Sequence, residues 1–356
     1  MGAVKLDICE PFILTIPDEC VPFLILKKGS KPFDKFVMEN YISFHAYDYQ
    51  NDTSDGFCLR FENYIAWETF GGFSSLHVPL SLQKNLGDPI GFLTDALERG
   101  YILMCDYNTF CVEAASSGKP RSHRVILYGC DREKRRFFCR DFIRGSLRPF
   151  EAGFDEMGRA LQDYPWPGEE KGGILGLRYD GDFESGSVSI CKLYTALCSL
   201  CSSDLLQRNN GVEAFGRRAL SVFRGGILHY SSPEEQAYRC SYWMNYVRES
   251  CKLMEYRLQY LKNCGPGCVS SGTEERFRAA RQSVEAAFMK LLKYEYKQRV
   301  DRAFLESTAE SCGEIEEAYM EFAGSLLEDC RALLKAGVTE VEQSRLYASA
   351  ERYSGA

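Results

Sequence analysis

The sequence predicts an α+β domain followed by an all-α helical domain, and three observations support this prediction. The chain has 356 residues, more than one hydrophobic core usually holds. Its first part mixes strand-like runs of aromatic and branched residues with a few helical patterns. From about residue 187, apolar residues recur at i, i+3, i+4 and i+7, which indicates packed helices. We therefore expect an α+β domain over 1–165, a crossing segment over 166–186 and a helical bundle over 187–356.

Two strand-like runs and one well-delimited helix mark the first domain. The runs at 11–16 (PFILTI) and 101–112 (YILMCDYNTFCV) are rich in aromatic and branched residues, which favour strands. Between these runs, Asp88 can cap a helix, Pro89 suits its first position and Gly100 is a typical stop. The first domain should therefore contain both strands and helices.

Cys20 lies at the start of an earlier helical run, CVPFLILKKG. Asp18 or Glu19 can cap this run. Pro22 is tolerable only near a helix start, and Gly29 ends the pattern. Because the pKa of a thiol falls at a helix N-terminus and beside an imidazolium, Cys20 is the first candidate for a reactive cysteine.

Residues 121–143 (RSHRVILYGCDREKRRFFCRDFI) predict a β-hairpin with a titratable residue near each outer end. A turn centred on Arg132 sets His123 directly opposite Asp141, with their Cβ atoms about 5 Å apart. A turn longer by one residue sets Phe142 opposite His123 instead. An Asp behind a His orients the ring and stabilises the imidazolium, as in catalytic triads. A satisfied polar contact between two strands is the alternative interpretation.

The segment 165–176 is dense in proline, glycine and charge, which is typical of a linker or crossing loop. A brief strand-like run follows at 174–183 (ILGLRYDGDF). Helical patterns then dominate the chain, and Ser232 before Pro233 and Glu235 is a good helix start. The helical patterns lie at 153–164, 187–207, 212–230, 232–263, 273–308 and 314–336.

Charge and cysteine usage restrict the class of protein. The formal net charge is −7, and a dedicated nucleic-acid binder normally has a basic domain or stripe. No apolar run approaches the ~20 residues that span a bilayer. Sixteen cysteines without a signal peptide are expected to be reduced thiols of a cytoplasmic protein. The expected partners therefore include neither nucleic acid nor membrane.

Most of these cysteines read as packing residues, since a buried thiol behaves as a small hydrophobe. Cys58, which follows a glycine turn, is the second candidate nucleophile. The pairs in 198–201 (CSLC) and 264–268 (CGPGC) could be halves of a zinc site, but a helix interior and a turn explain them more simply. We expect no metal and no cofactor.

The order of these motifs resembles a known family. Cys20 with LILKKG, SHRVILYGCD with His123, and FFCRDF with Asp141 are followed by GSLRPFEAGFDEMGRAL. This arrangement resembles the butirosin biosynthesis protein H N-terminal family, which has a papain-like fold close to bacteriocin-processing peptidases. The helical half is also similar in order and spacing to proteins that accompany nonribosomal peptide and polyketide assembly lines. The resemblance implies a papain-like, bacteriocin-peptidase-like first domain.

The function implied by the resemblance is cysteine-dependent acyl transfer in natural-product biosynthesis. Cys20 would take an acyl group from a carrier-protein thioester and pass it to an amine, His123 would act as base and then acid, and Asp141 would orient His123. The partner would be an acyl carrier protein or a synthetase domain. The stretch before Cys20 has no glutamine to hold an oxyanion, and the adjacent Glu19 would raise the pKa of the thiol. The alternatives are a non-catalytic accessory protein of such an assembly line and a small peptidase.

Overall fold

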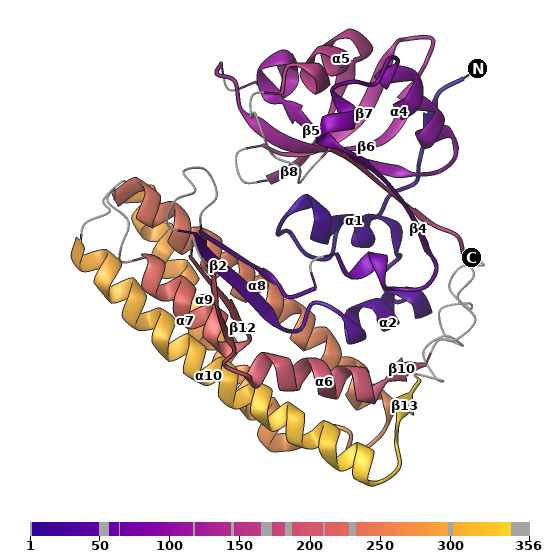
Figure 1. The fold of residues 1–356 in the computed structure, drawn as a ribbon. Helices are drawn as coiled ribbons and strands as arrows, with labels where there is room; N and C mark the ends of the chain where they lie inside the picture. The colour runs from indigo at the N-terminus through magenta and orange to yellow at the C-terminus, as the bar shows by residue number, and fades with distance from the viewer. Residues whose placement is uncertain are drawn as a thin grey trace. The chain divides into compact units, whose positions relative to one another are not determined.

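The chain divides into two compact units (Figure 1). Unit 1 contains Met1–Ser30 and Trp67–Glu184, and unit 2 contains Lys31–Ala66 and Ser185–Ala356. The structure is a computed structural model that describes residues 2–49, 57–63, 65–116, 118–143, 146–164, 173–181, 187–208, 211–227, 233–297 and 302–342. The α+β class is confirmed by antiparallel sheets with helices and a helical region toward the C-terminus. No helix among these residues is long and apolar enough to cross a membrane.

Unit 1 is built on one antiparallel sheet. Within its described residues the strand order is β4-β9-β5-β6-β7-β8, with β1 paired beside β6. The strand predicted within 174–183 is confirmed as β9, which ends at Tyr179, and it lies inside the sheet because β9 pairs with both β4 and β5. The strands are β1 Val4–Lys5, β4 Phe73–Pro79, β5 Ile102–Asn108, β6 Ser122–Asp131, β7 Arg136–Ile143, β8 Ser146–Gly153 and β9 Gly173–Tyr179.

Different helices cover the two faces of this sheet. Helices α4 (Pro89–Glu98) and α5 (Phe154–Gln162) share a core with Cys105, Val125 and Leu127, which alternate onto one face. Helix α1 (Pro17–Ile25) contacts β5, β6 and β9. An ion pair from its first turn to Arg124 places α1 on the opposite face. The sheet is therefore the middle layer of unit 1.

Helix α4 begins as the sequence predicts, and α5 lies within the helical pattern predicted over 153–164. The Asp88 carboxylate accepts a hydrogen bond from the Gly91 backbone N–H at 2.8 Å, which caps α4. The Glu156 carboxylate accepts from the Gly153 N–H at 2.7 Å at the start of α5. Gly100 adopts a φ of 86°, the left-handed conformation expected of a glycine that ends a helix.

Helix α1 differs from the prediction. Its N-cap is Ile16, which makes no side-chain cap, and Cys20 is the fourth helical residue rather than the first. Pro22 lies inside the helix, where its missing N–H and its ring weaken the helix. The preceding run 11–16 was predicted as a strand and forms none, because its residues pair with no strand of the sheet.

The hairpin of β6 and β7 is confirmed, but its register differs from the prediction. Leu127 pairs with Cys139 and Ile126 pairs with Arg140, after an irregularity between Leu127 and Gly129. Continuing this ladder sets Asp141 opposite Val125 and diagonal to His123. The reason is the position of the turn: Asp131 pairs with Arg136, so the turn is centred between Glu133 and Lys134 rather than on Arg132. The irregularity shifts the pairing back by only one residue.

Unit 2 combines a small sheet with helices, so the predicted all-α domain is wrong in this respect. Strands β11 and β12 pair with β2 and β3 in the order β11-β12-β2-β3. Residues 205–207 and 212–215 belong to the helical patterns predicted at 187–207 and 212–230, but they lie in strands. Gly216, with a φ of 58°, separates β12 from helix α7. The strands are β2 Phe44–Tyr49, β3 Phe57–Phe61, β11 Leu205–Arg208 and β12 Gly211–Phe215.

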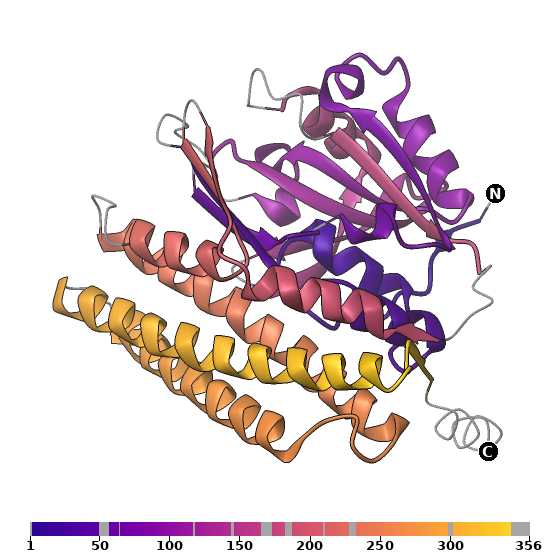
Figure 2. The ribbon, with the colours of Figure 1, turned by 60° about the horizontal axis from the view of Figure 1, so that its bottom comes forward.

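The helices of unit 2 are long and pack along one another, as α9 and α10 do in Figure 2. The predicted helix over 273–308 is divided, since α9 ends at Lys297 and α10 begins at Arg302. The helices are α2 Lys31–Glu39, α6 Ile190–Cys201, α7 Arg217–Ile227, α8 Pro233–Cys264, α9 Ser271–Lys297 and α10 Arg302–Lys335. Short elements complete the described chain: α3 Leu80–Gln83, β10 Val188–Ser189, β13 Glu340–Val341 and 3₁₀ turns at Ala66–Glu68, Thr109–Cys111 and Glu113–Ala115.

The compact units do not follow the division expected from the sequence. Residues 31–66 were expected in the first domain, but their contacts belong to unit 2 because Ala46 of β2 pairs with Ala214 of β12. Residues 166–186 were expected as a separate crossing segment, but their described part is β9, a strand of unit 1. Both differences arise from strand pairing between segments far apart in the sequence.

Candidate active site

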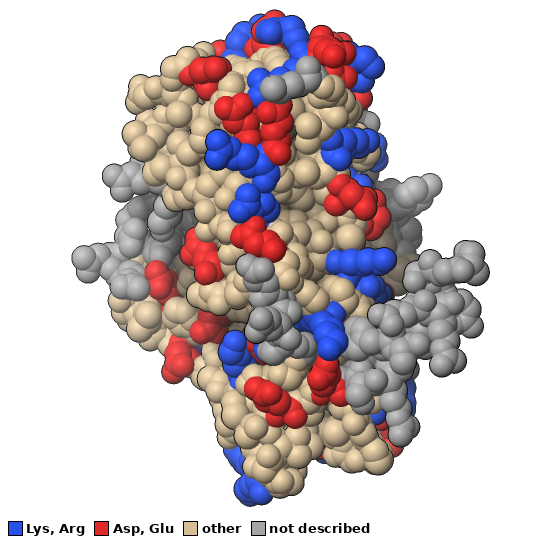
Figure 3. Space-filling model, turned by 90° about the vertical axis from the view of Figure 1, so that its right-hand side faces the viewer, with Lys and Arg blue, Asp and Glu red and all other residues tan. Residues whose placement is uncertain are grey.

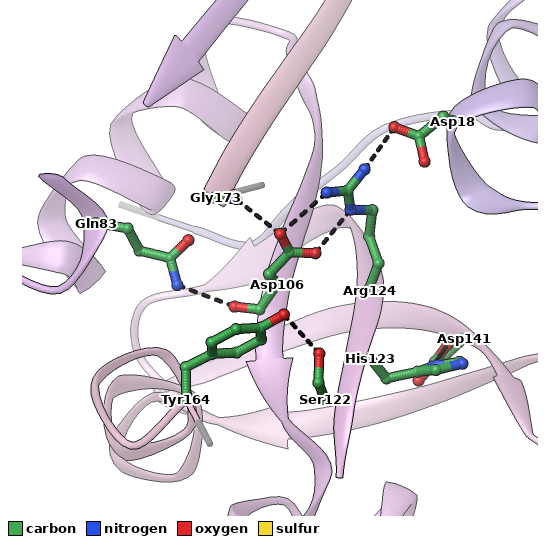
Figure 4. Close-up of polar contacts among 9 residues, drawn as sticks. All are labelled: Asp18, Gln83, Asp106, Ser122, His123, Arg124, Asp141, Tyr164 and Gly173. Atoms are coloured by element: carbon green, nitrogen blue, oxygen red, sulfur yellow. Dashed lines mark hydrogen bonds and ion pairs between the residues drawn. The ribbon is translucent and has the colours of Figure 1, made fainter. Parts of the chain in front are cut away.

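His123 and Asp141 form a pair on the face of the sheet that α4 and α5 cover. The His123 Nδ1 lies 2.6 Å from an Asp141 carboxylate oxygen (Figure 4). The Tyr107 hydroxyl donates to the other oxygen at 2.6 Å, and the Phe142 backbone N–H donates to the first at 2.6 Å. Asp141 is 2% exposed, so these groups take the place of water around its carboxylate.

This arrangement positions the imidazole for proton transfer. With Nδ1 directed at the carboxylate, the ring keeps Nε2 as its second proton-transfer atom. The His123 side chain is 36% exposed, whereas Asp141 behind it is buried. Burial and the Asp141 charge both raise the pKa of Tyr107, which therefore remains a hydroxyl donor. The pair can act as a base whose ring orientation is set from the protein interior.

Cys20 lies elsewhere in unit 1. Its thiol is fully buried and donates to the Ile13 carbonyl at 3.2 Å. Its backbone N–H donates to the Ile16 carbonyl at 3.0 Å and is therefore not available for an oxyanion. Asp18 of the same helix pairs with Arg124, the neighbour of His123 that points to the opposite face of β6. The structure thus brings His123 and Asp141 together and leaves Cys20 on the other side of the sheet.

A charged network lies on the face of the sheet that α1 covers, and the sequence patterns did not predict it. The Arg124 guanidinium donates to both Asp106 carboxylate oxygens, at 2.8 and 3.0 Å, and to Asp18 at 2.5 Å (Figure 4). The Gly173 N–H donates to Asp106 at 2.7 Å, and the Gln83 amide donates to the Asp106 carbonyl at 2.9 Å. The sequence signal for this network was Asp106, a carboxylate inside the apolar run 102–108 (ILMCDYN).

This network holds the site in place. It joins α1, β5, β6 and the start of β9, the elements that frame the ladder carrying His123 and Tyr107. A bidentate arginine–carboxylate pair restricts both partners more than a single contact does. The network therefore supports the ladder from the face opposite the imidazole.

Burial makes most of the other described cysteines poor nucleophiles, whereas Cys191, the second residue of α6, is exposed. Desolvation by burial raises the pKa of the thiols, which disfavours the reactive thiolate. The side chain of Cys58 lies outside the described residues. The thiols whose pKa is raised in this way belong to Cys9, Cys105, Cys111, Cys130, Cys139, Cys201, Cys251, Cys264, Cys268 and Cys330.

The described part of the chain contains no group of three or more histidine, cysteine, aspartate or glutamate side chains arranged to hold a metal ion. The zinc interpretation of 198–201 and 264–268 therefore has no set of ligands within these residues. Basic and acidic side chains are interspersed on the face of the molecule shown in Figure 3. A comparison with protein-family models and with curated proteins gave no match.

Proposed function

We propose that this protein transfers an acyl group from a carrier-protein thioester to an amine, with His123 as the general base and Asp141 as its positioning residue. The observation that supports this proposal is the buried carboxylate of Asp141, held by Tyr107 and directed at Nδ1 of a partly exposed imidazole. The acyl donor and the setting in natural-product biosynthesis come from the motif resemblance. A papain-like fold for unit 1 is part of the same proposal, supported by the order of helix, strand with His and strand with Asp.

The chemical step needs no cysteine. The acceptor amine attacks the thioester carbonyl carbon, and Nε2 of His123 takes the proton that the nitrogen loses. The carbon–sulfur bond then breaks, and the imidazolium returns the proton to the departing thiolate. Asp141 stabilises the imidazolium between these events. This direct route replaces the covalent intermediate on Cys20, whose thiol lies on the other face of the sheet and donates to a backbone carbonyl.

The proposal is tested with acetyl-N-acetylcysteamine as a thioester donor and hydroxylamine as an amine acceptor, by following hydroxamate formation. We expect His123→Ala to lower the rate about 10²-fold or more, because general-base catalysis typically contributes 10²–10⁴. Asp141→Asn should also lower the rate, because a neutral amide no longer stabilises the imidazolium and can favour the wrong tautomer of His123. Cys20→Ser is the matched control and should retain the parent rate. Loss of activity in Cys20→Ser with His123→Ala active would refute the direct route.

A non-catalytic accessory protein of an assembly line is the second candidate. The buried Cys20 thiol favours it, because a shell without a reactive cysteine can still bind a carrier or synthetase domain. This candidate predicts no hydroxamate above background from the parent protein. It also predicts that a carrier protein binds equally to the parent, to Cys20→Ser and to His123→Ala in a pull-down experiment.

A further inference from the structure

A polar cavity in unit 2 lies between α7 and α10 and is separate from the His123 site. Its volume is about 290 Å³. This is close to the lower end of small-molecule sites, about 300 Å³, so a small ligand would fill it. Three arginines of helix α7 line the cavity. The cavity is lined by Ser203, Arg217, Arg218, Ser221, Arg224, Gly313, Glu316 and Glu317.

Glu316 anchors the floor of this cavity. The Glu316 side chain is 5% exposed, and the Ser221 hydroxyl donates to it at 2.7 Å. Arg217 Nε and Arg224 Nη1 lie 3.6 and 3.3 Å from its two oxygens, so each guanidinium uses one nitrogen on this side. Among the described residues, the remaining side-chain nitrogens of both arginines have no hydrogen-bond partner.

Arg218 adds a third guanidinium to the wall. Within the described part of the chain it forms no hydrogen bond and no ion pair. Three guanidinium groups against Glu316 and Glu317 leave an excess of positive charge in the cavity. Such an excess attracts an anion and is not balanced by the described protein groups.

The absence of a side chain at Gly313 leaves space for the Arg224 guanidinium in the cavity wall. This glycine lies inside the long helix α10, where alanine would favour the helix more. A Cβ at position 313 would lie 2.7 Å from Arg224 Nη1, closer than real Cβ atoms approach other atoms. The helix therefore leaves space for a guanidinium at the position that faces Glu316.

We propose that this cavity binds the phosphate group of a small phosphorylated ligand. Guanidinium groups match phosphate oxygens with paired N–H donors, and the Ser203 and Ser221 hydroxyls offer further donors. A phosphate group offers more oxygen acceptors than one carboxylate does, so it can use N–H donors of several of these arginines at once. The site is independent of the proposed acyl transfer, because all its residues belong to unit 2.

The experiment uses the full-length protein and inorganic phosphate, with ³¹P line broadening and thermal unfolding as readouts. We expect phosphate to broaden its resonance and to raise Tm more than chloride at equal ionic strength. Arg218→Ala should weaken binding about tenfold or more. Gly313→Ala should also weaken it, without any change of charge, because the new Cβ displaces Arg224. Arg278→Ala on α9 removes one exposed arginine away from the cavity and should bind like the parent.

Two outcomes would overturn the proposal. Equal phosphate binding by the parent and by Arg218→Ala would show that the cavity is not the site. Acetate binding as tight as phosphate binding would show that the cavity selects carboxylates. Because Arg218 is exposed and makes no described contact, its variant should fold even where Gly313→Ala does not.

Discussion

His45 shows how one half-buried imidazole couples protonation to folding. Its ring stacks on Phe215 with centroids 4.7 Å apart, and its buried Nε2 has no hydrogen-bond partner among the described residues. Burial lowers the pKa of His45 below its ordinary value of 6.5; Glu213 opposes this shift and Arg60 adds to it. The folded state therefore binds this proton less tightly than the unfolded chain does.

The sign of the pH effect follows from this lowered pKa. The contribution of His45 to stability is complete above about pH 6.5, and it is lost as the pH falls toward the lowered folded value. We expect the unfolding free energy of the parent to decrease from pH 7.5 to 5.5 more than that of His45→Phe, which keeps the stack and cannot titrate. Urea titrations at both pH values measure the difference. Equal decreases in the two proteins would contradict the assignment.

The sequence also predicted that His123 and Asp141 pair, but it did not predict the geometry of the pair. The two residues stood out because they are titratable side chains near the ends of an apolar hairpin. The turn lies beyond Arg132, since Asp131 pairs with Arg136, and Asp141 therefore falls opposite Val125 and diagonal to His123. Cys20 was selected for a helix start, yet α1 begins at Pro17. Which face of a sheet a helix covers depends on tertiary packing, so the sequence alone did not exclude Cys20.

At the scale of elements, the C-terminus of α2 depends on an arginine from a helix more than two hundred residues away. Arg257 of α8 is fully buried, and one of its nitrogens donates to the carbonyls of Val37, Asn40 and Tyr41. The last carbonyls of a helix have no partner within it, so this guanidinium serves as the cap. Burial lowers the pKa of Arg257 to about 9.

Removal of this cap should destabilise α2 first. We expect Arg257→Met to lower the unfolding free energy by about 3 kcal/mol, because it leaves buried carbonyls without donors at about 1–3 kcal/mol each. Amides of α2 should exchange faster, as measured by hydrogen exchange. Arg281→Ala breaks an exposed ion pair with Glu255 and should cost at most about 1 kcal/mol. Similar losses from the two variants would argue against a capping role.

Local signals predicted some elements better than others. Helix α4 was recognisable from Asp88, Pro89 and Gly100, which act within the element itself. Strands β11 and β12 were read as helix, because their identity depends on pairing with β2, more than 150 residues earlier. Apolar runs of this length satisfy either period until a partner strand is known.

At the scale of the whole molecule, the chain crosses between the two units more than once. It begins in unit 1, builds part of unit 2 with residues 31–66, returns to complete unit 1, and ends in unit 2. A domain ending at residue 165 would lack β9, the strand between β4 and β5. A fragment that begins after it would lack β2, the partner of β12. Neither half predicted from the sequence is therefore a complete folding unit.

This organisation predicts the behaviour of fragments. A chain ending at residue 184 leaves β2 without β12 and α2 without Arg257, and the fragment 185–356 lacks the sheet partners that residues 31–66 supply. We expect the fragment 185–356 alone not to unfold cooperatively in urea, because it exposes apolar surface and unpaired strand edges. The chain ending at residue 184 keeps every strand of unit 1 and should unfold cooperatively. Mixing the two should restore near-ultraviolet circular dichroism and a single species in size-exclusion chromatography. A cooperative transition of 185–356 by itself would show that the helices of unit 2 need no residues from 31–66.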